Sequence, residues 1–284
     1  MLTSVRRIIT QAYRQHRLVV AFNTMNAETT LAVARAARQV GAPTLFEISE
    51  KTIVYLGLET VVALVRAASH EAGGRVPLGL HLDHGRSFKL CASAIRAGFS
   101  SVMIDGSALP FKANVQLTKR VVDFARRHRV MVQGEVGALV PRRRLTHLRV
   151  ASELMTDPVQ AREFVRLTGV DSLGVAVGTL HGPIKMFRKL PKIDFKRLRV
   201  IHEFVRVPLV LHGGSGVPVP DLKRAAKLGV TVVNIDTELR LAYLAAMRRE
   251  LARQRNEYDP RVVFGPVVAA LTALAVQKLR RLAR

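Results

Sequence analysis

The sequence predicts a closed (β/α)8 barrel, the TIM-barrel architecture, as a single domain over residues 1–284. Short apolar runs rich in β-branched residues alternate with segments of helical period, which favours a parallel sheet covered by helices. Eight such runs occur, and eight units in about 250 residues match the count and size of this barrel. The alternative is an open doubly wound sheet, but no Gly-x-Gly-x-x-Gly follows the first run, as the nucleotide-binding form of that fold would require.

Each run has the length of a strand and ends in polar or glycine residues. In chain order the expected strands are residues 18–23, 44–49, 77–83, 101–107, 130–137, 172–178, 208–214 and 230–237. The amphipathic segments, whose apolar residues recur every three or four positions, include residues 29–40, 59–71, 114–127, 158–167 and 220–227. The first 17 residues also show helical spacing. We expect a last helix at 262–276, too short to span a bilayer.

Composition narrows the class of protein. The apolar share is 49% and the charged share 23%, which is typical of a globular protein in water. Cys91 is the one cysteine, so an internal disulfide is excluded and a reducing compartment, the cytoplasm, is expected. The N-terminal residues lack the compact apolar core of a secretory signal, and we expect no membrane partner.

The formal net charge of +24 attracts anions such as phosphorylated metabolites, nucleic acid or anionic lipid. Basic residues are spread along the whole chain, with denser runs at 126–129, 142–144 and 278–284. Spread charge favours a solvated, arginine-rich surface. Zinc-finger spacing and aromatic RNA-binding strands are absent from the sequence. Contact with nucleic acid is therefore expected only as nonspecific binding to the basic surface.

Polar residues stand where the expected strands end. In a closed parallel barrel these ends meet at one rim, which is where active sites of this fold lie. From the first strand to the eighth, the rim residues are Asn23, Ser49, Asp83 with His84, Asp105, Glu135, His181, His212 and the segment 234–237.

Three of the rim residues are histidines, His84, His181 and His212, from strands three, six and seven. Three neutral imidazoles with an open fourth position form a catalytic Zn²⁺ site rather than a closed structural one. His81 lies inside its strand, where a structural or supporting role is expected. The histidines on predicted helices or loops are given no functional role; they are His16, His70, His128, His147 and His202.

A phosphate site is predicted at the same rim. Phosphate needs backbone N–H groups with few side chains in the way. The loop with Gly213, Gly214 and Ser215 and the segment with Asn234, Asp236 and Thr237 follow strands seven and eight, where barrels commonly bind phosphate. Further candidates for the anion pocket are Gly182, Lys185 and, across the rim, Ser49.

The motifs HLDHG, SVMIDGS, TGVDSLGVAVGTLHG, PLVLHGGSGVP and NIDTEL stand in order along the chain. In this set the sequence resembles the class II, zinc-dependent fructose-bisphosphate/tagatose-bisphosphate aldolase family. The resemblance runs from AFNTMN at residue 21 to DPR at residue 259. It implies reversible cleavage of a ketose bisphosphate to dihydroxyacetone phosphate and an aldehyde phosphate. It also implies a homo-oligomer, a dimer or tetramer, that takes a phosphorylated sugar.

The resemblance assigns roles to particular residues. By resemblance, His84, His181 and His212 hold the catalytic Zn²⁺, and Asp83 is the acid/base at the C4 oxygen. Asp105 and Glu135 match carboxylates that support the metal or hold it in an alternative position, and a second divalent or monovalent cation is compatible with the set. The residues that match the phosphate site are Asn23, Ser49, Gly182, Lys185, Gly213, Gly214, Ser215, Asn234, Asp236 and Thr237.

One loop departs from the family pattern. After strand five the family reads roughly ELGxxGGxED, whereas this chain reads EVGALVPRRRL. The acid of the pattern, the base that moves the C3 proton, falls at about Arg143, which stays protonated. Glu153 is a candidate substitute, and Gln133 stands where an acid is usual. Three alternatives follow: a slower or re-specified aldolase, an aldolase whose residues 142–144 bind an extra anionic group, and a non-catalytic paralogue that binds sugar phosphate or nucleic acid.

Overall fold

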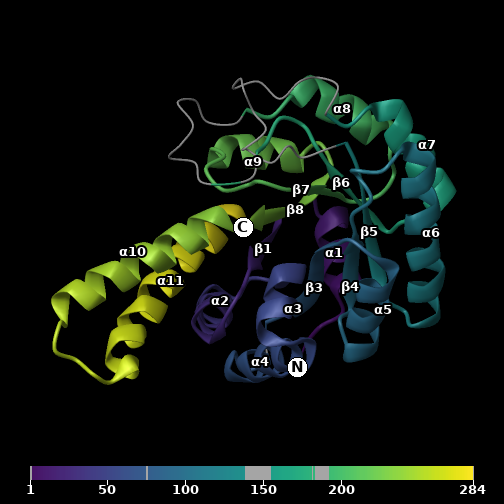
Figure 1. Ribbon diagram of the computed structural model, residues 1–284. Coiled ribbons are helices and arrows are strands. Elements are labelled where there is room, and N and C mark those ends of the chain that lie inside the picture. Colours follow the sequence, from purple (N-terminus) through teal and green to yellow (C-terminus); the bar gives the residue numbers. More distant parts are fainter. Residues whose placement is uncertain (1, 75, 138–154, 181, 183–191, 284) are drawn as a thin grey trace.

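The protein is a closed parallel barrel whose strands follow one another in sequence order (Figure 1). The computed structural model describes residues 2–74, 76–137, 155–180, 182 and 192–283. The strands are β1 (Val19–Asn23), β2 (Thr44–Ser49), β3 (Leu78–Gly85), β4 (Ser101–Ile104), β5 (Met131–Val136), β6 (Ser172–Val175), β7 (Leu209–Leu211) and β8 (Val230–Ile235). β1 pairs in parallel with both β2 and β8, which closes the ring. The (β/α)8 prediction is therefore confirmed, and the open doubly wound sheet is excluded.

Helices cover the outside of the barrel (Figure 1). They are α1 (Val5–Arg14), α2 (Ala27–Val40), α3 (Glu50–Leu56), α4 (Leu58–Glu71), α5 (Phe88–Ala97), α6 (Phe111–Arg127), α7 (Pro158–Thr168), α8 (Phe195–Phe204), α9 (Val219–Ala226), α10 (Thr237–Arg253) and α11 (Pro260–Leu282). Local signals set their ends. Asn26 caps α2 by accepting from the Thr29 backbone N–H at 3.1 Å, and Gly41 ends it in the left-handed conformation.

Several strands are shorter than the apolar runs suggest. β4 ends at Ile104, and β6 ends at Val175, while the expected runs continued to residues 107 and 178. β7 ends at Leu211, before Gly213, which has a φ of 68°. The positive φ of Gly213 departs from the extended conformation, and the chain turns out of the sheet there. Asp105 and His212 therefore lie in loops just beyond their strands rather than within them.

Helix α1 closes the amino-terminal end of the barrel. Its residues Val5, Ile8 and Ile9 are buried in one cluster with inward-facing strand side chains. Gly79 of β3 makes this close approach feasible, because a Cβ there would lie 2.6 Å from Val5 Cγ2. With the floor sealed by apolar packing, the open end of the barrel is the carboxyl end of the strands.

Helices α10 and α11 form a hairpin that extends away from the barrel (Figure 1). The expectation of a last helix at 262–276 was wrong about its length, because α11 has 23 residues. Its most apolar window of 18 residues has a mean hydropathy of 1.8 and is 39% buried. Asp259 caps its start, and it continues through Arg280 and Arg281, which the apolar run had left out. By length and composition it could cross a membrane, but the core helix of a globular protein passes the same test. Its buried side packs on α2 and α10.

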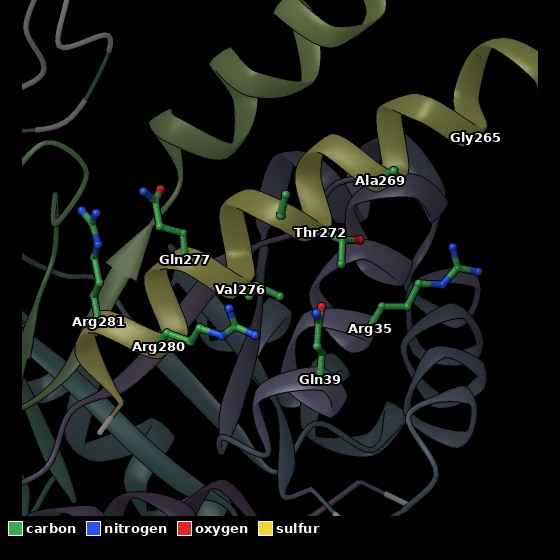
Figure 2. Close-up of a pocket in the computed structure, with 10 residues that line it drawn as sticks. Arg35, Gln39, Gly265, Ala269, Thr272, Val276, Gln277, Arg280 and Arg281 are labelled. Carbon is green, nitrogen blue, oxygen red and sulfur yellow. The ribbon is translucent and has the colours of Figure 1, made fainter.

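A broad hollow of about 670 Å³ lies between α2 and α11 (Figure 2). We call it the α2–α11 hollow; its lining residues are Arg35, Gln39, Gly265, Ala269, Thr272, Ala273, Val276, Gln277, Arg280 and Arg281. Small residues of α11 form its floor, and arginines and glutamines stand around its edge. It is built from outer helices, not from strand ends.

Candidate functional site

Strand β3 delivers two adjacent side chains, Asp83 and His84, to the mouth of the barrel. Consecutive residues of a regular strand point to opposite faces. Here His84 has a φ of 48°, and the pairing of β3 with β4 shifts register between Leu82 and Gly85. Such a bulge redirects side chains. As a result, ligand atoms of Asp83, His84 and His212 all lie within 4.8 Å of one another.

The two histidines face each other through ring nitrogens. Nε2 of His84 lies 3.1 Å from Nδ1 of His212. Two ligands about 2.0–2.1 Å from a tetrahedral zinc ion are separated by roughly this distance. The Thr179 hydroxyl donates to the backbone oxygen of His212 at 2.7 Å and holds the loop after β7 in place. The third predicted histidine, His181, lies outside the described residues.

Asp105 orients His84. Its Oδ2 lies 2.8 Å from Nδ1 of His84, and its Oδ1 accepts from the backbone N–H and the hydroxyl of Ser107 at 3.1 and 2.6 Å. Burial raises the pKa of Asp105, but the bonds to His84 and Ser107 outweigh it and hold the pKa below its usual range. An ionised Asp105 fixes the His84 proton on Nδ1 and leaves Nε2 to face His212.

The electrostatics of the mouth favour a positive charge. Burial lowers the pKa of His84, yet Asp83 and the hydrogen bond to Asp105 outweigh it and raise the pKa to about 10. Burial raises the pKa of Glu135 to about 8 and that of Glu47 well above its usual range. The raised pKa values mean that these groups favour their protonated forms. A bound cation could take the place of these protons.

Oxygen atoms of the mouth also point to a cation. Among the described residues, Oδ1 of Asp83 and Oε2 of Glu135 are buried without a hydrogen-bond partner. Oε2 of Glu135 lies 3.7 Å from Nε2 of His212. Two imidazoles and nearby carboxylates form a donor set that suits a divalent transition metal. The residues present therefore fit a metal centre.

Asp83 is held as an ionised carboxylate. Asn23, at the end of β1, donates to its Oδ2 at 2.7 Å. Burial raises the pKa of Asp83, but His84, His212 and this hydrogen bond lower it below the usual value. Oδ1 lies 3.8 Å from Nε2 of His84. A buried, oriented carboxylate beside the histidine pair can accept a proton from a bound substrate.

A cavity of about 250 Å³ connects the histidine pair with the loops after β7 and β8. Its lining residues are Asn23, Ser49, Lys51, Asp83, His84, His212, Gly213, Ser215, Asn234, Asp236, Thr237 and Arg240. Helix α10 begins at Thr237, so its N-terminus, which favours anions, lies at this cavity.

The loop after β7 owes its shape to its glycines. A Cβ on Gly213 would lie 2.6 Å from the Leu180 oxygen, and one on Gly214 would lie 2.3 Å from a Val233 methyl carbon. The Gly214 N–H donates to the Asn234 oxygen at 3.1 Å, so this predicted phosphate residue packs the loop and does not line the cavity. Gly182 has a φ of 105° and does not line it either. Lys185 lies outside the described residues.

His81 contacts the start of the neighbouring strand β4. Its Nδ1 lies 2.8 Å from the Ser101 hydroxyl, and burial lowers its pKa to about 4. It is not part of the group of close ligand atoms. Histidines given no role lie on or beside helices, namely His16, His70, His128 and His202, and His147 falls outside the described residues.

Sequence reasoning missed three cations at the mouth. Lys51 and Arg240 line the cavity of the histidine pair. Lys51 also lines a wider neighbouring cavity of about 700 Å³ together with Arg86, Asp105 and Glu135. Arg240 is paired with Asp236. Lys51 and Arg86 each stand two residues after a predicted site residue, and this spacing was a usable signal.

Comparisons with known proteins agree with this geometry. The family model described as "Fructose-bisphosphate aldolase class-II" matches residues 3–284. The chain is 38% identical to the fructose-bisphosphate aldolase of Geobacillus stearothermophilus over 280 residues, which is 98% of this chain and 96% of that one. A probable fructose-bisphosphate aldolase of Bacillus subtilis (strain 168) is equally similar, 38% identical with the same coverage.

A solved structure extends the likeness to the fold. The crystal structure of the YdjI aldolase from Escherichia coli K12 superposes with a TM-score of 0.84 at 31% identity, covering 99% of this chain and 97% of that one. The family match, the identity to the relatives and the shared barrel all point the same way. The chain belongs to the class II fructose-bisphosphate aldolase family.

Proposed function

We propose that this protein is a zinc-dependent lyase that reversibly cleaves a ketose bisphosphate, of the fructose- or tagatose-1,6-bisphosphate kind, to dihydroxyacetone phosphate and an aldehyde phosphate. The observation that carries the proposal is the convergence of Asp83, His84 and His212 within 4.8 Å beside a cavity formed by a glycine loop and a helix N-terminus. Membership of an aldolase family supports carbon–carbon bond cleavage. It does not favour the alternative of a non-catalytic binding protein.

The residues that would hold the ion are His84, His212 and, from the segment beyond β6, His181. Asp105 and Glu135 are proposed for an alternative position or a second divalent or monovalent cation. When bound, zinc polarises the substrate carbonyl and disperses the negative charge left by bond cleavage. Orientation of His84 by Asp105 holds the ligand nitrogen ready, so little rearrangement is needed on binding.

Asp83 would supply the proton transfer. When the C3–C4 bond breaks, the C4 hydroxyl becomes a carbonyl and must lose its proton. Asp83 is ionised because its pKa is lowered, and Asn23 fixes one oxygen while the other stays available. In the direction of synthesis the same carboxyl returns the proton to the new hydroxyl.

The substrate's two phosphates would bind on opposite sides of the histidine pair. The phosphate of the dihydroxyacetone half is proposed to lie against Gly213, Ser215 and the start of α10. Gly182 and Lys185 are proposed to lie beside it on the ground of the sequence resemblance alone. The phosphate of the aldehyde half is proposed to lie between Lys51 and Arg86 in the wider cavity. Charge-assisted contacts of this kind are the strong ones in phosphate recognition.

The base for the C3 proton is proposed to be Glu153, since Arg143 cannot accept a proton. Both residues lie outside the described part of the chain. The same is true of residues 142–144, which would bind the extra anionic group in the alternative of an aldolase with a different substrate. We further propose a cytoplasmic homo-oligomer, a dimer or tetramer, whose subunit number sedimentation analysis would give.

Steady-state cleavage of fructose and tagatose bisphosphates, with and without EDTA and with zinc restored afterwards, tests the proposal. We expect turnover of at least one sugar, lost with the chelator and regained with zinc. Metal binding without turnover of either sugar would contradict the catalytic assignment. Turnover that survives EDTA and leaves no bound metal would contradict the metal mechanism.

A further inference from the structure

Gln133 of β5 lies inside the barrel beneath the histidine pair. Its side chain is 3% exposed, and His212 is fully buried above it. The amide Nε2 lies 2.9 Å from Nε2 of His212 and donates to Met103 Sδ at 3.3 Å. The amide thus contacts the ring nitrogen of His212 that faces away from His84.

The two ring nitrogens of His212 have different tasks. Nδ1 faces Nε2 of His84 at 3.1 Å, so it is the atom that can bind an ion shared with His84. A neutral imidazole carries one N–H and one lone pair. If Nδ1 gives its lone pair to a cation, the proton must lie on Nε2, and it needs an acceptor. Glu135 Oε2, at 3.7 Å, is beyond hydrogen-bond distance, whereas the Gln133 amide is within it.

We propose that Gln133 is a positioning residue that sets the tautomer of His212. An amide offers a donor at one end and an acceptor at the other. With its nitrogen toward the ring, as seen here, Gln133 suits a ring that carries its proton on Nδ1. With its oxygen toward the ring, it accepts from Nε2–H and leaves Nδ1 free to bind metal. The inference rests on the proposed metal site.

The neighbouring strand makes room for this contact. Gly174 of β6 is paired with Glu135 of β5. A Cβ at Gly174 would lie 3.1 Å from Glu135 Oε2 and 3.3 Å from both Gln133 Nε2 and His212 Nε2. Any side chain at this position would crowd the amide and the ring at their point of contact. Gly174→Ala therefore perturbs the same contact without changing either partner.

Zinc affinity, measured by competition with a chromophoric chelator at pH 8, tests the inference. Gln133→Met removes the hydrogen bond at similar volume, and we expect zinc to bind about 10- to 100-fold more weakly. Gln133→Glu keeps an oxygen acceptor and is expected to restore affinity to at least that of the parent protein. Met103→Leu, the matched control, removes the other contact of Gln133 and should leave affinity within about threefold.

A second readout separates tautomer control from packing. In the metal-free parent protein, ¹⁵N NMR of labelled histidine should show His212 mainly in one tautomer, and Gln133→Met should show a mixture of both tautomers. If Gln133→Met does not fold, Gly174→Ala is expected to weaken zinc binding in its place. Affinity for zinc that is the same in Gln133→Met, or equally weak in Gln133→Glu, overturns the inference. A parent protein that binds no zinc would instead overturn the proposed function.

Discussion

The barrel mouth and the α2–α11 hollow are both concave, but they are built from opposite chemistry. Their volumes do not tell them apart: the hollow has about 670 Å³, and the two cavities of the mouth have about 250 Å³ and about 700 Å³. Its floor is alanine, glycine and valine, and no described histidine or carboxylate lines it (Figure 2). The mouth instead gathers buried imidazoles and carboxylates whose pKa values are shifted by burial and by one another. Perturbed titratable groups, not cavity volume, identify the functional site.

Removal of a proposed metal ligand should give the sharpest contrast between the two regions. We expect His212→Ala to abolish zinc retention and turnover, because Nδ1 of His212 faces the ligand nitrogen of His84. Metal analysis after gel filtration measures the retention. His70→Ala, at the end of α4, is the control and should keep its metal. A His212→Ala protein with stoichiometric zinc would remove this residue from the site.

Asp83→Ala should separate chemistry from metal binding. We expect zinc content to remain while cleavage falls about 10²- to 10⁴-fold, the usual contribution of a positioned general base. Asp123→Ala is a matched control, since Asp123 is exposed and paired with Lys119 on α6. Unchanged cleavage in Asp83→Ala would take Asp83 out of the mechanism.

Lys51→Ala and Arg86→Ala should have smaller effects that depend on the substrate. Each is expected to lower kcat/KM for the bisphosphate roughly tenfold, the size of one lost hydrogen bond to a charged group. In the direction of synthesis, the loss should vanish when glyceraldehyde replaces its phosphate. Lys119→Ala, an exposed lysine on α6, is the control. Equal losses with both aldehydes would show that these cations do not bind the second phosphate.

The smallest effect is expected in the α2–α11 hollow. Gln39→Ala should leave kcat/KM within about twofold and the melting temperature nearly unchanged, as for most exposed substitutions. Cleavage assays and thermal unfolding check this. A large loss of turnover would contradict this expectation, because it would connect the hollow to the reaction.

The fold followed from sequence because each unit repeats the same pattern. The run LVVAFN contains β1, and the segment at 29–40 lies within α2. The strand ends were less predictable, since Gly213 leaves the sheet through its backbone conformation rather than through its polarity. The length of α11 was missed because its last turn is charged, although charged residues suit a helix end.

The candidate site was visible in part. His84, Asp83 and His212 stood out because they follow apolar runs, and the structure brings them together. The contact of Gln133 with His212 depends on register between strands far apart in the chain, which no local pattern carries. Lys51 and Arg86 were not recognised as site residues, because the chain has 45 lysines and arginines and one more cation carries little information.

The left-handed backbone at His84 limits which residues this position holds at low energetic cost. With its φ of 48°, this position holds a side chain in a conformation that glycine or asparagine would adopt at lower cost. The backbone conformation does not explain a histidine at this position, whereas its proposed role as a metal ligand does. A homologue without the proposed ion would be expected to carry glycine or asparagine at this position.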